Sequence, residues 1–240
     1  TLIDTCSEDH ASELMERIAD VVDPAQIAYV VSNHSEKDHA GSLREVLARA
    51  REAKVVTSVR GRDILATYLG DERELIPVKT GDELSIGSRA LQFVQTPMVH
   101  WPDNMVTYAP QDRLLFSNDA FGQFLATSER FDDEVDAGLL FQSAKKYYAN
   151  IVLPHSRQTA TAPASVGELD LDMIAPSHGL IWRSRIPEIM ERYRTWSALE
   201  PTDSAVVVYA SMYGSTARMA EAITEGFMAQ GVSVRTFDLH

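Results

Sequence analysis

The 240-residue chain holds 35 acidic residues against 22 lysines and arginines, giving a formal net charge of −13. Nucleic acid is therefore excluded as an expected partner, because phosphate binding requires clustered cations. Cys6 is the only cysteine, so no internal disulfide can form, and a reducing compartment such as the cytoplasm is favoured. No apolar run reaches the length of a membrane span, so we expect no membrane association.

The first part of the chain alternates strands with helices. Residues 1–5 resemble the end of a strand and no initiator Met precedes them, which suggests a fragment. Apolar residues at helical or strand spacing then predict helices at 8–22, 42–51 and 61–69, and strands at 27–32, 54–58 and 75–79.

The next part consists mainly of short strands, which we expect to be antiparallel. Strands are predicted at 83–86, 90–95, 105–109, 113–116 and 171–175, and helices at 131–153 and 186–196. Residues 157–168 show no apolar stripe, so neither a helix nor a strand is predicted there. Alternating βα units followed by hairpins predict an α/β fold with two packed sheets covered by helices. Residues 200–203 then form a predicted linker.

Four potential metal ligands, His34, Glu36, Asp38 and His39, directly follow the strand at 27–32. We predict that they lie in a loop that ends at Gly41. Imidazole and carboxylate donors without thiolate suit iron, manganese or zinc. A solvated polar loop with two chance histidines is the alternative for this stretch alone.

Three further candidates also follow apolar strands: His100 between Pro97 and Pro102, Asp119, and His178. Strand ends on one side of a sheet converge, so four segments could supply seven ligands to one pocket. Seven ligands exceed the needs of one tetrahedral ion and match two metals bridged by the Asp119 carboxylate. Each residue alone is more often structural. The remaining histidines, His10, His155 and His240, are interpreted as structural or surface residues.

A phosphate-binding loop is predicted near the end of the chain. The apolar strand 205–209 precedes a loop of hydroxyl-bearing and small residues, and a helix is predicted at 217–229. Backbone N–H groups and hydroxyls at a helix start suit a phosphate, whereas a simple Ser/Thr helix cap is the alternative. The loop comprises Ser211, Met212, Tyr213, Gly214, Ser215 and Thr216.

Four ordered motifs, HSEKDHAGS, TPMVHWPDNM, LFSNDAFGQ and APSHGLIWR, resemble the ligand segments of the flavodiiron proteins, or A-type flavoproteins. The resemblance implies a metallo-β-lactamase-like αββα sandwich at 1–200, without its first strands, and the truncated start of a flavodoxin-like doubly wound domain at 204–240. It also implies that one iron is held by His34, Glu36 and His100, that the other is held by Asp38, His39 and His178, that Asp119 bridges them, and that FMN binds the loop at 211–216. Relatives can leave the position of His39 uncoordinated.

The same resemblance implies an oxidoreductase that reduces dioxygen to water, nitric oxide to nitrous oxide, or both. Electrons would arrive through FMN from a rubredoxin-like donor, in a head-to-tail homodimer or a dimer of dimers. Glu36 stands where hydrolytic zinc relatives usually carry His, and its hard oxygen favours iron. A dinuclear zinc hydrolase and a regulator with a degenerate site are the alternatives.

Some positions near the expected site are less clear in role. Phe124 stands where relatives often carry His. Met98, Trp101 and Phe121 are candidates for an apolar wall that excludes water, or for ordinary core packing.

Overall fold

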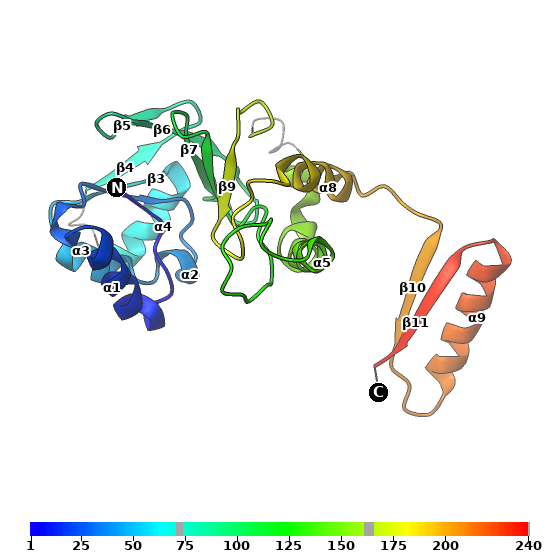
Figure 1. The fold of residues 1–240 in the computed structure, drawn as a ribbon. Coiled ribbons are helices and arrows are strands. Elements are labelled where there is room, and N and C mark those ends of the chain that lie inside the picture. The colour runs from blue at the N-terminus through cyan, green and yellow to red at the C-terminus, as the bar shows by residue number, and fades with distance from the viewer. Residues whose placement is uncertain (71–73, 161–165, 240) are drawn as a thin grey trace. The chain divides into compact units, whose positions relative to one another are not determined.

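The computed structural model describes residues 1–70, 74–160 and 166–239 (Figure 1). The chain divides into two compact units, Thr1–Ala198 and Leu199–His240. Among the described helices, none is long and apolar enough to cross a bilayer.

The first sheet of the larger unit is entirely parallel. Within the described residues it has four strands in the order β1, β2, β3, β4, with bounds Leu2–Ile3, Tyr29–Ser32, Lys54–Ser58 and Leu75–Val78. Its connecting helices are α1 (Ala11–Val21), α2 (Lys37–Ala40), α3 (Leu43–Arg49) and α4 (Val59–Leu69), with short 3-10 turns at Glu8–His10 and Pro24–Gln26. Parallel neighbours require crossover connections, which these helices provide.

The second sheet is antiparallel except at its last pair. The described part has five strands in numerical order: β5 (Glu83–Ser85), β6 (Ala90–Gln95), β7 (Met105–Ala109), β8 (Leu114–Asn118) and β9 (Met173–Pro176). Strand β9 pairs parallel with β8. Between them the chain forms α5 (Ala137–Tyr147), a π-helical turn at Tyr148–Val152, a 3-10 turn at Leu153–His155 and α6 (Ser156–Thr159); α8 (Ile186–Ala198) follows β9.

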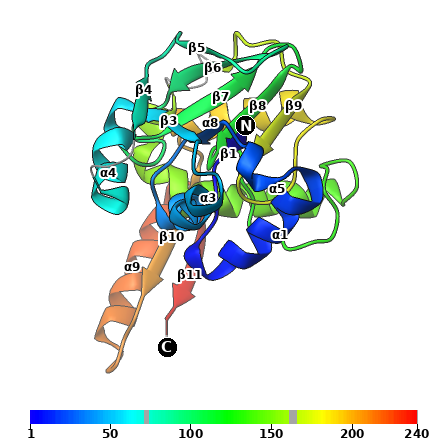
Figure 2. The same cartoon turned by 90° about the vertical axis from the view of Figure 1, so that its left-hand side faces the viewer.

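Side-chain alternation along the strands creates three apolar layers. Val30 packs among residues of α1, α3 and α4, whereas the next residue, Val31, packs in the layer that also contains Phe93 of β6 and Met105 of β7. On the other side, Leu115 of β8 lies in a cluster with residues of α5 and α8. Helices therefore cover the outer face of each sheet (Figures 1 and 2), and the predicted αββα sandwich is confirmed.

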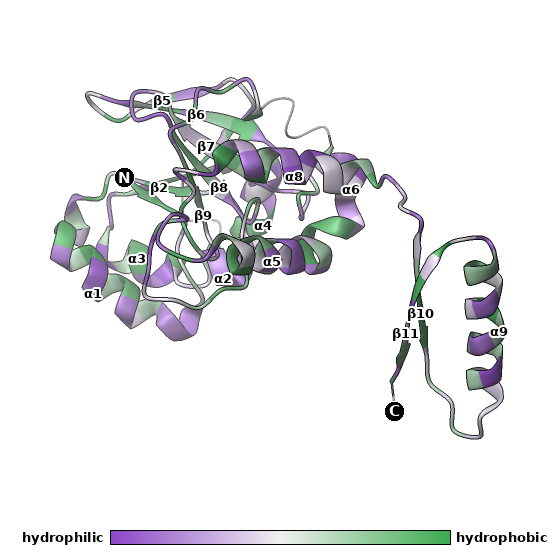
Figure 3. Ribbon diagram, turned by 45° about the vertical axis from the view of Figure 1, so that its right-hand side comes forward, coloured by the Kyte–Doolittle hydropathy of each residue, from purple (hydrophilic) through white to green (hydrophobic). Residues whose placement is uncertain are grey.

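The smaller unit is a single β-α-β element. Strands β10 (Ser204–Tyr209) and β11 (Ser233–Asp238) pair in parallel, and α9 (Ser215–Ala229) connects them. Ala220 is the one buried apolar residue among its described positions. Green apolar segments are visible on these strands and on α9 in Figure 3.

Two local predictions were wrong. The expected loop at 34–39 includes a helical turn, because Glu36 takes the extended conformation of a helix N-cap and places Asp38 and His39 in α2. The helix expected at 131–153 begins only at Ala137, because the Asp136 side chain accepts a hydrogen bond from Leu139 N. The unassigned stretch 157–168 contains most of α6, while its residues 161–165 lie outside the described part of the chain.

Candidate metal centre

The seven predicted ligands come together at the ends of strands from both sheets. His34 follows β2, His100 follows β6, Asp119 directly follows β8, and His178 follows β9. Their donor atoms form two groups, each with all its atoms within 4.8 Å of one another. The first group is His34, Glu36, His100 and Asp119, and the second is Asp38, His39 and His178.

The first group is centred on two carboxylates facing two imidazoles. Glu36 Oε2 lies 3.1 Å from His34 Nε2 and 3.2 Å from His100 Nε2. Asp119 Oδ2 lies 3.5 Å from each of the same two nitrogens. Four donors thus converge on one position, which is enough for one ion with room for another ligand.

The second group has the same design with different residues. Asp38 Oδ2 lies 3.4 Å from His39 Nε2 and 3.3 Å from His178 Nε2. Asp119 turns its other oxygen, Oδ1, to these nitrogens at 3.3 and 3.2 Å. The two oxygens of Asp119 therefore face different groups, which is the geometry that a bridging carboxylate requires.

Asp119 and His178 have the most strongly shifted pKa values among the predicted ligands. Burial raises the pKa of the Asp119 carboxyl, but the facing imidazoles of His178 and His39 outweigh burial and hold the pKa far below its usual range. Hydrogen bonds to Asp119 and then Asp38 raise the pKa of His178 to about 9, against the effect of burial. Without a metal, His178 is thus held as an imidazolium beside two carboxylates, and a cation that binds to its ring nitrogen must displace a proton.

Unpaired buried atoms in the site fit a metal. His39 Nε2 and Asp119 Oδ2 are buried, and the described residues offer neither of them a hydrogen bond of good geometry. Leaving such atoms unsatisfied costs about 1–3 kcal/mol each. A divalent ion at each group would satisfy both atoms, and a donor set of nitrogen and oxygen without sulfur suits iron, manganese or zinc.

Two buried side chains support the ligands and were not predicted as site residues. Asp103 Oδ2 accepts hydrogen bonds of 2.7 Å from Ser35 N and Ser35 Oγ and lies 3.4 Å from His34 Nδ1. Tyr147 donates its hydroxyl to Asp119 Oδ1 at 2.8 Å. The sequence signal that could have identified Asp103 is its position in the Pro102-Asp103-Asn104 turn, directly after the predicted ligand segment of His100. Tyr147 lies at helical spacing with the apolar residues of the predicted helix 131–153, so the sequence predicted only that it packs in the core.

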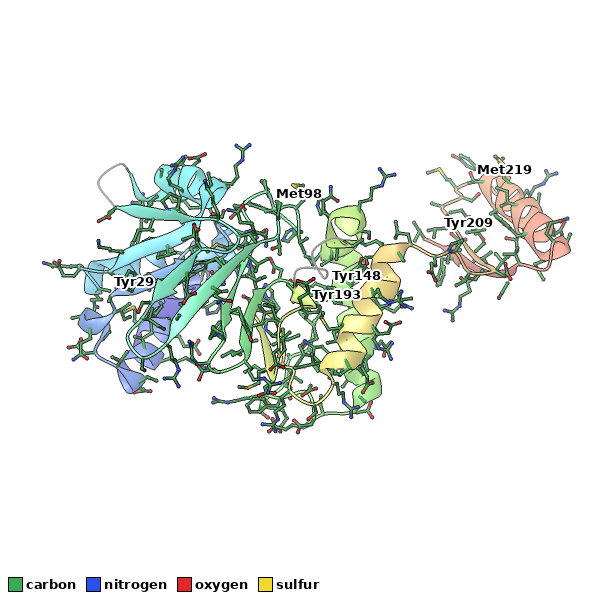
Figure 4. The ribbon with its side chains drawn as sticks, turned by 90° about the horizontal axis from the view of Figure 1, so that it is seen from above. Tyr29, Met98, Tyr148, Tyr193, Tyr209 and Met219 are labelled. Carbon is green, nitrogen blue, oxygen red and sulfur yellow. The ribbon has the colours of Figure 1, made fainter. Side chains whose placement is uncertain are left out.

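Aromatic rings line the first group and flank the Asp119 segment. Trp101 lies edge-on to His34, with ring centroids 5.2 Å apart. Phe121 packs against Tyr193 at 4.4 Å, and Tyr193 in turn contacts Tyr148 at 5.0 Å (Figure 4). Phe121 is therefore both a core residue and a neighbour of the site.

Two other predicted neighbours are more exposed. Phe124 is 47% exposed, and its ring lies 4.8 Å from that of Tyr147. Met98 is half-buried and has a φ of 65°. Phe124 is therefore a partly exposed aromatic side chain in contact with the buried Tyr147.

The two other histidines that the structure describes do not join either group. His10 is exposed in the turn before α1, and His155 is half-buried before α6. His155 is still close enough for its charge to contribute, after burial, to lowering the pKa of His100. His240 lies outside the described residues.

The loop at 211–216 leaves a helix start open. Gly214 is the N-cap of α9 with a φ of 78°, a conformation that favours glycine. No side chain in the described chain caps this helix, and Met212 and Tyr213 are largely exposed. The first N–H groups of a 15-residue helix are thus available to an anion.

Comparison with known proteins gives two family matches. Residues 1–179 match the ODP family beta lactamase, and residues 207–240 match flavodoxin. The nitric oxide reductase of Moorella thermoacetica is 42% identical over 241 residues, 99% of this chain and 60% of that protein. The coenzyme F420H(2) oxidase of Methanothermobacter marburgensis is 41% identical over 248 residues, 100% of this chain and 61% of that protein.

A solved structure is also similar to this chain over nearly its whole length. The rubredoxin oxygen:oxidoreductase of Desulfovibrio gigas matches with a TM-score of 0.92 and 36% identity, covering 98% of this chain and 60% of that chain. The present chain spans about 60% of the length of these relatives. A β-lactamase-like domain followed by the start of a flavodoxin domain defines the class. The chain belongs to the flavodiiron proteins.

Proposed function

We propose that this chain carries the diiron centre and the first part of the flavin site of a reductase for dioxygen, nitric oxide or both. The observation that carries the proposal is Asp119, whose two oxygens face two ligand groups. Membership of the flavodiiron proteins supports iron as the metal and FMN as the flavin. The relatives named nitric oxide reductase and rubredoxin oxygen:oxidoreductase support the two gases and a rubredoxin-like donor.

The side chains have distinct roles in this proposal. His34, Glu36 and His100 hold one iron, Asp38, His39 and His178 hold the other, and Asp119 bridges them. When bound, a diiron pair would supply the electrons for reduction of the gas. Tyr147 is placed to hold a proton beside the bridge, because its hydroxyl donates to Asp119 Oδ1, and the pKa of this hydroxyl is raised by burial and the neighbouring carboxylate.

The flavin proposal rests on the loop at 211–216. Its open helix start suits the phosphate of FMN, and we assign residues 1–200 to the diiron domain and 204–240 to the FMN domain. A cytoplasmic protein that pairs head to tail, as a dimer or a dimer of dimers, completes the proposal. Size-exclusion chromatography with light scattering of the full-length protein tests the assembly.

A dinuclear zinc hydrolase is the second candidate, because the αββα scaffold with histidine and carboxylate donors also suits zinc. Glu36 is the residue that separates the two. Its carboxylate lies between His34 and His100 and adds negative charge to the first position, which favours the higher charge of ferric iron over redox-inert zinc.

The test begins with the full-length protein isolated without added metal. Iron and zinc are measured, the protein is reduced anaerobically, and consumption of dioxygen and of nitric oxide is followed in separate experiments. We expect iron in both positions and consumption of at least one gas. Glu36→His should lower iron relative to zinc and slow gas consumption, whereas His10→Gln, at an exposed histidine outside the site, should change neither.

Two results would contradict the proposal. Zinc in both positions together with ester or thioester hydrolysis would favour the hydrolase. Protein that holds iron but consumes neither gas after reduction would remove the reductase assignment even if the metal sites are correct.

A further inference from the structure

Gln123 joins the two segments that carry Asp119 and His178. It is 2% exposed and lies four residues after Asp119. Its backbone N–H donates to the carbonyl of His178 at 3.0 Å. Its side-chain Oε1 accepts from Leu180 N at 2.5 Å, and its Nε2 donates to Phe121 O at 2.8 Å. A buried amide thus bonds to the backbone of both segments at once.

Gly179 is fitted to this amide. Its φ of 88° favours glycine, and a Cβ built there would lie 2.1 Å from Gln123 Oε1. Any larger residue would push the amide away from Leu180 N. Gln123 and Gly179 therefore form a matched pair directly beside the ligand His178.

Further bonds make the two segments one unit. Ser177 N donates to Asn118 O at 2.8 Å, and the indole of Trp182 donates to Phe121 O at 2.8 Å. These bonds tie the chain just before His178 and well after it to the Asp119 segment. Gln123 bonds to the chain between these two points, because its N–H donates to the carbonyl of His178 and its Oε1 accepts from Leu180 N.

His178 depends more on such support than Asp119 does, because its side chain is the less enclosed of the two, although its ring contacts those of His39 and Tyr147. Its side chain is 35% exposed, whereas that of Asp119 is 3% exposed. The position of the imidazole relative to Asp119 Oδ1 is then determined by the backbone that carries it. His34, by contrast, is fully buried and has Asp103 behind its ring.

We propose that Gln123 is a positioning residue that fixes His178 against the bridging carboxylate and thereby selectively stabilises metal binding at the second group, Asp38, His39 and His178. The inference rests on the proposed two-metal site. It predicts that the two metal positions depend on different supports, so that a change at Gln123 acts on one of them.

The experiment is a titration of the full-length, metal-free protein with Co²⁺, followed by its visible absorbance. Gln123→Glu keeps the shape but replaces the donor that faces Phe121 O by a second acceptor, and Gln123→Leu removes all side-chain bonds. Supporting residues of metal ligands typically contribute 10–100-fold in affinity. We therefore expect the Co²⁺ equivalent that Asp38→Ala abolishes to bind about that much more weakly, and the other equivalent to stay within about threefold.

Gln95→Leu is the matched control. Gln95 is a partly buried glutamine whose Nε2 also donates to a backbone carbonyl, that of Val78 at 2.8 Å, but it lies at the end of β6, outside the Asp119 and His178 segments. It should leave both equivalents unchanged. Asp38→Ala should leave a single equivalent, and adding Gln123→Leu to that variant should not weaken it further.

The outcomes separate this inference from the proposed function. Equal weakening of both equivalents, or no change in either, would overturn the role of Gln123 while leaving a two-metal site intact. A wild-type protein that binds no Co²⁺ would overturn both. If Gln123→Leu does not fold, the isosteric Gln123→Glu variant and Gly179→Ala decide the question by the same comparison of equivalents.

Discussion

Asp4 should make the stability of the metal-free protein depend on pH. Its buried carboxylate accepts hydrogen bonds from Asn33 N at 2.7 Å and Asn33 Nδ2 at 3.1 Å. Burial raises its pKa from the ordinary value of 3.8 to about 6, although the charges of His39 and His34 and the bonds from Asn33 oppose the rise.

The sign follows from the raised pKa. Protonation of Asp4 is stronger in the folded protein, so its stabilising effect is fully present below about pH 4 and is lost as the pH rises through about 6. With these two pKa values, lowering the pH from 7 to 5 adds about 1.3 kcal/mol to the free energy of unfolding. The Asp4→Asn side chain does not titrate, so this pH-dependent increase in the free energy of unfolding should be absent in the variant. Any destabilisation that the amide itself causes should be the same at both pH values.

Urea unfolding at pH 7 and pH 5, followed by tryptophan fluorescence, measures the effect. Trp101, Trp182 and Trp196 all lie in the larger unit, so fluorescence reports the unit that contains Asp4. Because other groups also titrate, the relevant quantity is the difference in pH dependence between the wild type and Asp4→Asn. Parallel changes in the two proteins would refute the reasoning.

Three further results are expected. Asp103→Asn should weaken Co²⁺ binding at the first position about 10–100-fold in the same titration, because the carboxylate behind His34 is lost; unchanged affinity would contradict this role. Tyr147→Phe should lower the free energy of unfolding in urea by about 1.5–3 kcal/mol, because the bond to the Asp119 carboxylate is charge-assisted; a loss near zero would mean that the hydroxyl is not needed. A chelator should remove one metal per chain quickly and the other slowly, as followed by absorbance, since the second group is the more exposed; a single rate would argue against this asymmetry.

Much of the fold could be predicted because strand periodicity is a local property. Val30 and Val31 face opposite sides of their sheet, as strand geometry requires. Helix boundaries were less predictable. The spacing of apolar residues continues through 131–136, but capping by Asp136 starts α5 at Ala137.

The convergence of the seven candidate ligands could be predicted from the sequence, but the residues that support them could not. Histidines and carboxylates after strands are visible in the sequence, and the structure brings all seven together. Gln123 contacts Leu180 across 57 residues, and Tyr147 reaches Asp119 across 28. Such contacts depend on which strands and helices become neighbours, which no local pattern in a single sequence records.

The two ligand groups differ in a way that bears on how the site works. In the first, the side chain of His34 is fully buried and a buried carboxylate lies behind it, so the metal position is supported through side chains. In the second, Asp38 is 45% and His178 35% exposed, and the support of His178 comes through backbone bonds at Gln123. Asp119 belongs to both, with one oxygen turned to each group. In the proposed two-metal site, the buried first position and the more exposed second position would share the buried Asp119 carboxylate, and a small molecule would reach the second position more directly.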